Sequence, residues 1–272
     1  MCGIIGYVGE GEAAPVLLDG LKRLEYRGYD SAGIAVFTPE GVRTVKARGR
    51  IACLVEKLKH ESPLSGVVGI GHTRWATHGE PSDRNAHPHT SGRVTLVHNG
   101  IVENYQALKA EREAEGVSFL SETDTEVLDA TLDHFYAGDP VAAIAQTARA
   151  VEGSYALCIL FSDRPGELYA IRRDSPLVIG VGAGEMFVAS DMTVLLQHTR
   201  QYLLPQPDEI AKVTKDGVQL FDLDGRPCEA PVRTADWDIG TAEKGGYKHF
   251  MLKEIHEEPQ AVHNCLSPRI RG

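Results

Sequence analysis

The chain has 272 residues, of which 42% are hydrophobic and 24% charged, ordinary proportions for a globular protein with a sizeable core. Its formal net charge of -10 offers no basic face and argues against a nucleic-acid partner. No apolar run approaches the roughly 18 residues that cross a membrane, and the N-terminus lacks the basic-then-apolar layout of a signal peptide. The sequence therefore predicts a cytoplasmic protein without membrane segments.

Apolar patterning along the chain predicts a mixture of strands and helices. Gly3–Val8 is typical of a short buried strand, and from residue 14 to 24 apolar residues recur at the spacing of an amphipathic helix, which Arg27 and Gly28 would end. Further strands are predicted at 33–37, 42–46, 67–72 and 94–97, helices at about 104–115, 124–136 and 140–151, and several short strands from 154 to 225.

Hairpin-like connections outnumber β-α-β units in this pattern, which favours antiparallel sheets covered by helices over a doubly wound parallel sheet. A change in composition near residues 238–241 places the end of the main domain at about residue 240. Beyond it, 243–246 resembles a linker, and 247–265 is predicted to be partly helical with an interruption at Pro259.

The five cysteines are widely spaced, odd in number and without a CxxC pair, so neither a disulfide framework nor a thiolate zinc site is indicated. Cys53 and Cys158 lie in apolar stretches and are predicted to be small buried hydrophobes. Cys2 differs, because removal of Met1 would leave a thiol and a free α-amine on one residue. An α-amine has a pKa of roughly 7.7–8.0 and can serve as the base for such a nucleophile. Taken alone, however, a cysteine at position 2 is more often incidental than catalytic.

Six short motifs give Cys2 a context. They are MCGI at 1–4, LEYRGYDSAG at 24–33, GHTRWATHG at 71–79, NAHPH at 85–89, VHNGIVEN at 97–104 and SETDTE at 121–126. In this order they resemble the glutaminase domain of the class II glutamine amidotransferases, which use an N-terminal nucleophile. The amino-acid sequences of these motifs are most similar to those of the isomerising glutamine–fructose-6-phosphate aminotransferase family.

The resemblance implies an α+β fold, a four-layer α/β/β/α sandwich of two antiparallel sheets. It also implies that residues 1–240 form a glutaminase domain and that 241–272 lead into sugar-isomerase domains, which would receive ammonia and convert fructose 6-phosphate to glucosamine 6-phosphate. Glutamine would be the substrate, no cofactor would be needed, and the full-length protein would be a homodimer.

Amide hydrolysis passes through an oxyanion that needs hydrogen-bond donors aimed at it. The resemblance gives Cys2 the role of nucleophile and assigns the donor role to the Asn99 side chain and the Gly100 N–H. The alternative is structural, because Asn-Gly is a favoured dipeptide for a two-residue hairpin turn.

The resemblance also implies that Arg74 binds the α-carboxylate of glutamine and that Asp124 binds its α-ammonium. An arginine fork suits this task because it can hold both carboxylate oxygens at once. For Asp124 the alternative is a structural role at a helix start, since residues 123–126 also fit a capping box. Both roles can hold if Thr123 caps the helix.

Further binding residues follow from the same resemblance. Trp75, Thr77 and His78 match a mobile loop that folds over bound substrate, His87 would line the glutamine pocket, and Arg27 would orient the terminus. For Trp75 the alternative is plain core packing.

The histidines at 72, 78, 87, 89 and 98 form no HExxH motif and have no thiolate partner, so no metal site is predicted. The rival functions are another class II amidotransferase and a non-catalytic glutamine-sensing module.

Overall fold

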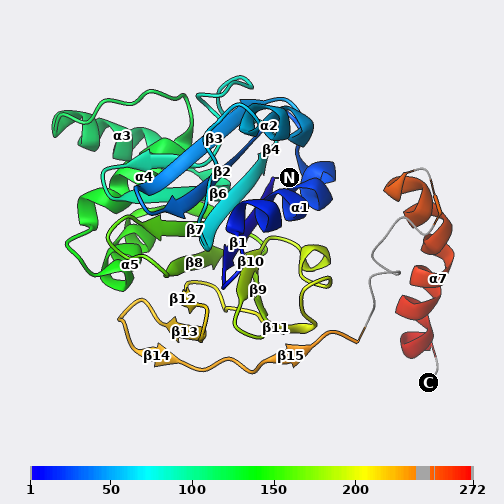
Figure 1. Ribbon diagram of the computed structural model, residues 1–272. Helices are drawn as coiled ribbons and strands as arrows, with labels where there is room; N and C mark the ends of the chain where they lie inside the picture. The colour runs from blue at the N-terminus through cyan, green and yellow to red at the C-terminus, as the bar shows by residue number, and fades with distance from the viewer. Residues whose placement is uncertain (1, 237–245, 248, 271–272) are drawn as a thin grey trace. The chain divides into compact units, whose positions relative to one another are not determined.

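The computed structural model describes residues 2–236, 246, 247 and 249–270. The chain divides into two compact units, Met1–Thr234 and Ala235–Gly272, and the first contains all the described strands (Figure 1). The predicted boundary between residues 240 and 241 lies outside the described residues, so that prediction remains untested.

Two antiparallel sheets form the centre of the first unit. In spatial order the strands of the first sheet are β15 (Arg233–Thr234), β11 (Gln201–Leu203), β9 (Val178–Val181), β10 (Met186–Ala189), β1 (Gly3–Val8), β4 (Val68–Arg74), β2 (Ser31–Thr38) and β3 (Gly41–Arg48). The second sheet runs β14 (Pro227–Cys228), β13 (Gly217–Phe221), β12 (Ile210–Thr214), β8 (Leu168–Arg173), β7 (Gly153–Phe161), β6 (Val94–Val102) and β5 (His89–Ser91).

The strand that follows Cys2 lies in the interior of its sheet. All residues of β1 are buried, and β1 pairs with β10 on one side and β4 on the other. Ile4 stands opposite His72, and Gly3 opposite Thr73. A continuous apolar strand of this kind is stable only when both of its faces are covered.

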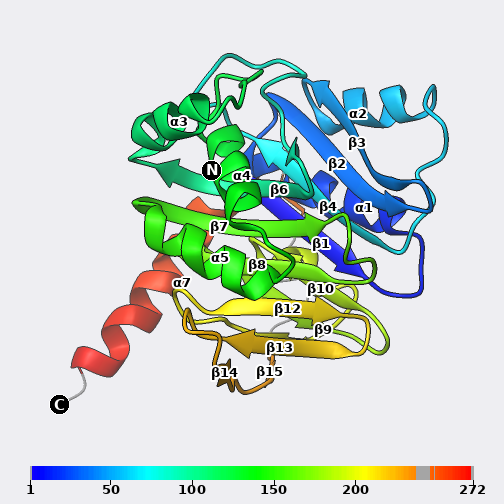
Figure 2. The same cartoon turned by 90° about the vertical axis from the view of Figure 1, so that its left-hand side faces the viewer.

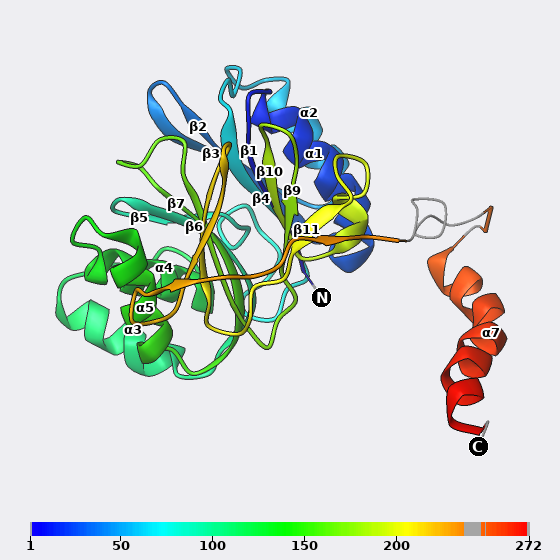
Figure 3. The ribbon, with the colours of Figure 1, turned by 90° about the horizontal axis from the view of Figure 1, so that it is seen from below.

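Helices cover the outer face of each sheet (Figures 2 and 3). On the first sheet lie α1 (Ala13–Leu24) and α2 (Ile51–Leu58), and on the second lie α4 (Asp124–Phe135) and α5 (Pro140–Ala150), with α3 (Tyr105–Ala114) beside α4. Three buried apolar clusters fill the spaces between the four layers. The predicted four-layer α/β/β/α sandwich is confirmed. Two short 3₁₀ helices complete this unit: η1 (Glu25–Arg27) connects α1 to β2, and η2 (Met192–Val194) connects β10 to β11.

The prediction for Cys158 is confirmed and that for Cys53 is wrong. Cys158 is fully buried, whereas Cys53 is exposed. The run around Cys53 forms α2, in which Ile51 and Leu54 face the core. A helix buries positions three apart and turns the residue between them outward. The one-dimensional apolar run did not reveal this.

In the second unit, α7 (Phe250–Ile270) is one helix that continues through Pro259. The predicted interruption at Pro259 is therefore wrong. Proline removes one hydrogen bond from a helix interior, but the other turns of this 21-residue helix remain. No helix in the described part of the chain combines the length and the apolar character of a membrane span.

Candidate active site

Cys2 lies at the start of β1, against the backbone that follows β4. Its Sγ accepts a hydrogen bond from the Trp75 N–H at 3.2 Å. Burial raises the pKa of the Cys2 thiol, and the Trp75 N–H opposes this increase. The thiol is therefore protonated near neutral pH and needs a base before it can act as a nucleophile.

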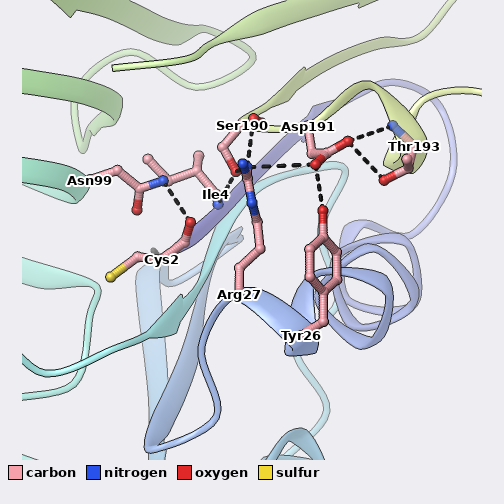
Figure 4. Close-up of polar contacts among 8 residues, drawn as sticks. All are labelled: Cys2, Ile4, Tyr26, Arg27, Asn99, Ser190, Asp191 and Thr193. Atoms are coloured by element: carbon pink, nitrogen blue, oxygen red, sulfur yellow. Dashed lines mark hydrogen bonds and ion pairs between the residues drawn. The ribbon is translucent and has the colours of Figure 1, made fainter. Parts of the chain in front are cut away.

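Asn99 reaches the same residue from the other sheet. Its Nδ2 donates to the Cys2 carbonyl oxygen at 3.1 Å (Figure 4). The hairpin alternative for Asn99 and Gly100 is wrong, because β6 continues to Val102 and pairs with β7 along its whole length. The site thus lies between the sheets, with the thiol on one and the side-chain amide on the other.

Gly100 cannot be replaced without strain. Its φ is +141°, and an added Cβ would lie 2.0 Å from the Ser154 carbonyl oxygen. Only glycine combines this backbone conformation with so close an approach. Gly100 therefore lets β6 continue past Asn99 while remaining paired with β7.

Four histidines near the site are buried, namely His72, His87, His89 and His98. His72 Nε2 is 3.0 Å from Asn99 Oδ1, and the His72 and His87 rings stack at 4.2 Å. His89 and His98 make their hydrogen bonds to threonines, at 3.1 and 3.0 Å. Burial lowers the pKa of His72 to about 3 and holds the pKa values of the other three below their ordinary range.

Among the described residues, no group of three or more His, Cys, Asp and Glu is arranged to hold a metal. From the sequence, His72 was considered only as a possible metal ligand, and its contact with Asn99 was not predicted. No local signal could have shown this contact, because the two residues lie on strands of different sheets.

Arg74 ends β4 and is buried. Its guanidinium donates to the carbonyl oxygen of His78, to that of Gly79 at 3.1 Å and to that of Glu80 at 3.5 Å. These contacts hold the segment after β4 against the site. A carboxylate on Arg74 would compete with these carbonyl oxygens for the same N–H groups.

Asp124 is the first residue of α4 and is buried. Its Oδ2 accepts from the Val102 N–H at 3.0 Å, so it joins α4 to the end of β6. Thr123 caps the helix by accepting from the Glu126 N–H at 3.3 Å. The reciprocal half of a capping box is absent in this helix, because the Glu126 carboxylate accepts instead from the N–H groups of Leu120 and Ser121.

The segment that follows Arg74 is open to solvent. The core-packing alternative for Trp75 is wrong, since this residue is 48% exposed and meets Tyr29 edge-on at 5.7 Å. Thr77 is exposed, and the His78 ring packs edge-on against Tyr105 at 5.4 Å. Gly28 lets the preceding loop approach, because a Cβ there would lie 2.7 Å from the Arg74 carbonyl carbon.

Arg27 is anchored at the end of β10 (Figure 4). Its Nη1 donates to the Ser190 carbonyl oxygen at 2.8 Å and forms an ion pair with Asp191 at 3.6 Å. Ser190 Oγ in turn accepts from the Ile4 N–H at 2.9 Å. This network holds the first residues of β1, and hence the position of Cys2. No motif in the sequence marks Ser190 or Asp191.

Known proteins resemble this chain over its whole length. Residues 72–197 match the family described as glutamine amidotransferase domain. The chain is 50% identical over 272 residues to the isomerizing glutamine–fructose-6-phosphate aminotransferase of Clostridium tetani, an alignment that covers 99% of this chain and 45% of that protein. The chain contains a glutamine amidotransferase domain.

A second relative of this amidotransferase domain is the enzyme of the same name from Thermus thermophilus, 52% identical over 273 residues. That alignment covers 100% of this chain and 45% of the relative, so the chain spans about half the length of the curated relatives it matches.

Solved structures agree with the fold. The glutamine phosphoribosylpyrophosphate amidotransferase of B. subtilis matches with a TM-score of 0.71 and 26% identity, over 83% of this chain and 50% of that one. A glutamine aminotransferase class-II domain protein from Silicibacter pomeroyi, at 17% identity and a TM-score of 0.56 over 82% of this chain and 99% of that one, shares the fold alone.

Proposed function

We propose that this amidotransferase domain hydrolyses the side-chain amide of glutamine, with Cys2 as the nucleophile. One observation carries the proposal: the Asn99 amide of the second sheet reaches the Cys2 backbone of the first at 3.1 Å. A nucleophile and a donor for an oxyanion are thereby held side by side. The role of Cys2 requires removal of Met1, because the thiol needs its own α-amine as base.

The chemistry follows from these groups. The α-amine takes the proton from the Cys2 thiol, and the sulfur attacks the amide carbon. The carbonyl oxygen becomes negative and accepts hydrogen bonds from Asn99 Nδ2 and the Gly100 N–H. Ammonia leaves with the proton that the amine returns, and a thioester remains. Water then attacks the thioester, releases glutamate and restores the thiol.

Substrate binding would use the residues around Arg74. We assign Arg74 to the α-carboxylate of glutamine and Asp124 to its α-ammonium, since each is a buried charged group beside the site. Trp75, Thr77 and His78 would close over the substrate, His87 would line the pocket, and Arg27 would hold the terminus in place. Closure would release the 78–80 carbonyl oxygens from Arg74, which frees its N–H groups for the substrate.

The acceptor of the ammonia belongs to the whole protein. Because the relatives named glutamine–fructose-6-phosphate aminotransferase are about twice as long as this chain, we infer that sugar-isomerase domains of the same cytoplasmic, homodimeric protein receive the ammonia. Incubated with glutamine and fructose 6-phosphate, the 272-residue chain should form glutamate without glucosamine 6-phosphate. Enzyme-dependent amino sugar would show that this chain itself binds the sugar phosphate.

The nucleophile can be identified by mass mapping after treatment with a glutamine-analogue diazo-ketone. We expect the adduct on Cys2, with protection by glutamine. Cys53 is the matched control, because it is exposed and therefore accessible to the reagent. Cys53→Ser should keep full glutaminase activity, and Cys2→Ser should lose nearly all of it. A chain that binds glutamine but releases no ammonia would instead be a sensing module.

A further inference from the structure

His72 crosses the boundary between the two sheets. It lies on β4 of the first sheet, opposite Ile4 of β1, and is fully buried. Its Nε2 is 3.0 Å from Asn99 Oδ1 and 3.1 Å from the His98 carbonyl oxygen, both on β6 of the second sheet. One side chain therefore joins the strand next to the nucleophile to the strand that carries Asn99.

The partners of His72 determine its protonation. When the Asn99 amide nitrogen donates to Cys2, the two groups near His72 Nε2 are Asn99 Oδ1 and the His98 carbonyl oxygen, which are both acceptors. Nε2 must therefore carry the hydrogen. Nδ1 is buried and has no hydrogen-bond partner among the described residues. A protonated Nδ1 would be an unsatisfied buried donor beside the stacked His87 ring, 4.2 Å away. His72 is thus the neutral Nε2–H tautomer.

The Asn99 amide could in principle take either of two orientations, because its oxygen and nitrogen are nearly equal in size. In the orientation seen here, Oδ1 faces the His72 Nε2–H and Nδ2 faces Cys2. Turned by 180°, the amide would direct NH₂ at the His72 N–H and would direct an oxygen at the place where negative charge develops. In the first contact two hydrogen-bond donors would face each other without an acceptor. In the second, the Asn99 oxygen would repel the negatively charged oxygen of the transition state.

We propose that His72 is a positioning residue that holds the Asn99 amide with its nitrogen toward Cys2 and its oxygen away. The NH₂ group has two hydrogens, of which one binds the Cys2 carbonyl oxygen. The other remains for the oxyanion. This inference rests on the proposed function, since it concerns the donor that glutamine hydrolysis would use.

A matched pair of variants isolates the N–H of His72. His72→Gln and His72→Met have similar side-chain volumes, but only glutamine can donate to Asn99 Oδ1. We expect His72→Met to lower kcat for glutamine hydrolysis by about 10- to 100-fold, by analogy with the loss of a group that orients a metal ligand. KM should change little, and His72→Gln should remain within about threefold of the unmodified chain. Equal kcat values for the two variants would overturn the proposal.

A buried histidine elsewhere is the control for general damage. His89 is also buried and bonded through Nε2, but to Thr123 at 3.1 Å and not to Asn99. His89→Met should therefore lose stability as His72→Met does and keep kcat within about threefold. A kcat as low as that of His72→Met would assign both losses to disturbed packing and overturn the proposal.

A double-variant cycle separates this inference from the proposed function. If His72 acts through Asn99, the Asn99→Ala/His72→Met chain should be no slower than Asn99→Ala alone. Additive losses would overturn the inference. If Asn99→Ala itself left kcat unchanged, the oxyanion role in the proposed function would fail instead. Alkylation of Cys2 by iodoacetamide, which forms no oxyanion, should proceed at the same rate in all three variants.

A measurement on the unmodified chain covers the case in which His72→Met does not fold. Long-range proton–nitrogen NMR correlations distinguish the two histidine tautomers. We expect His72 to show a protonated Nε2 and an unprotonated Nδ1 from pH 5 to pH 8. A protonated Nδ1, or a titration near pH 6.5, would overturn the proposal.

Discussion

At the scale of single residues, the Asn99 side chain makes two contacts that depend on one orientation, to Cys2 at 3.1 Å and to His72 at 3.0 Å. Asn99→Ala removes a donor that would act only in the transition state. We expect kcat for glutamine hydrolysis to fall by roughly 10²–10³, while KM changes little. Steady-state kinetics with a thermal melt would check this. A loss of stability in proportion to the loss of activity would point to a structural role in β6.

Arg74 is predicted to bind the α-carboxylate of glutamine in the ground state, before the reaction begins. Arg74→Lys keeps the charge but loses the planar fork, so KM for glutamine should rise by about tenfold or more while kcat changes less. The exposed Arg84 provides the matched control, and Arg84→Lys should leave both constants unchanged. An unaltered KM in Arg74→Lys would exclude the carboxylate clamp.

At the scale of elements, β6 passes through the site without a break because position 100 is glycine. Gly100→Ala would combine a strained φ of +141° with a contact of 2.0 Å to the Ser154 carbonyl oxygen. We expect the free energy of unfolding to fall by at least about 2 kcal/mol, measured by urea denaturation.

Gly116 is the control for this effect. Its φ is +91°, but nothing lies within 4 Å of an added Cβ. Gly116→Ala should therefore show only the cost of the backbone conformation, and the difference between the variants should report the close approach of β6 to β7. Equal destabilisation in the two variants would contradict this account.

At the scale of the whole molecule, the four buried neutral histidines make folding sensitive to acid. The pKa of His72 is lowered to about 3, and those of His87, His89 and His98 are also lowered, so below pH 6.5 the unfolded chain binds more protons than the folded one. Their stabilising contribution is complete above the unfolded pKa and is lost as the pH falls. Each should remove on the order of 1 kcal/mol per pH unit.

One buried group opposes this trend. Burial raises the pKa of Asp129 well above its ordinary value, so its contribution decreases as the pH rises. The combined effect of the four histidines on the free energy of unfolding should exceed the opposite effect of Asp129. Urea denaturation between pH 5 and pH 8 should therefore show a free energy of unfolding that decreases as the pH falls. His72→Gln should reduce the slope of the free energy of unfolding against pH by about the contribution of one histidine. A flat profile would mean that the histidines are charged in the folded chain.

Much of the fold could be predicted from local patterns and from resemblance. The β1 strand and the α1 helix begin and end within a residue of their predicted bounds, because an apolar run and a periodic stripe are properties of adjacent residues. The candidate site residues were all named from motifs, and their proposed roles remain to be tested.

Sequence alone determined which chemical groups are present: a thiol at position 2, an Asn-Gly pair, an arginine at position 74 and several histidines. Tertiary structure decided what each of them faces. Nine residues of β6 pair with β7 and override the turn preference of Asn99 and Gly100, since many ladder hydrogen bonds outweigh one local propensity. The contact of His72 with Asn99 likewise exists only because two sheets pack face to face, and such packing depends on residues far apart in the chain.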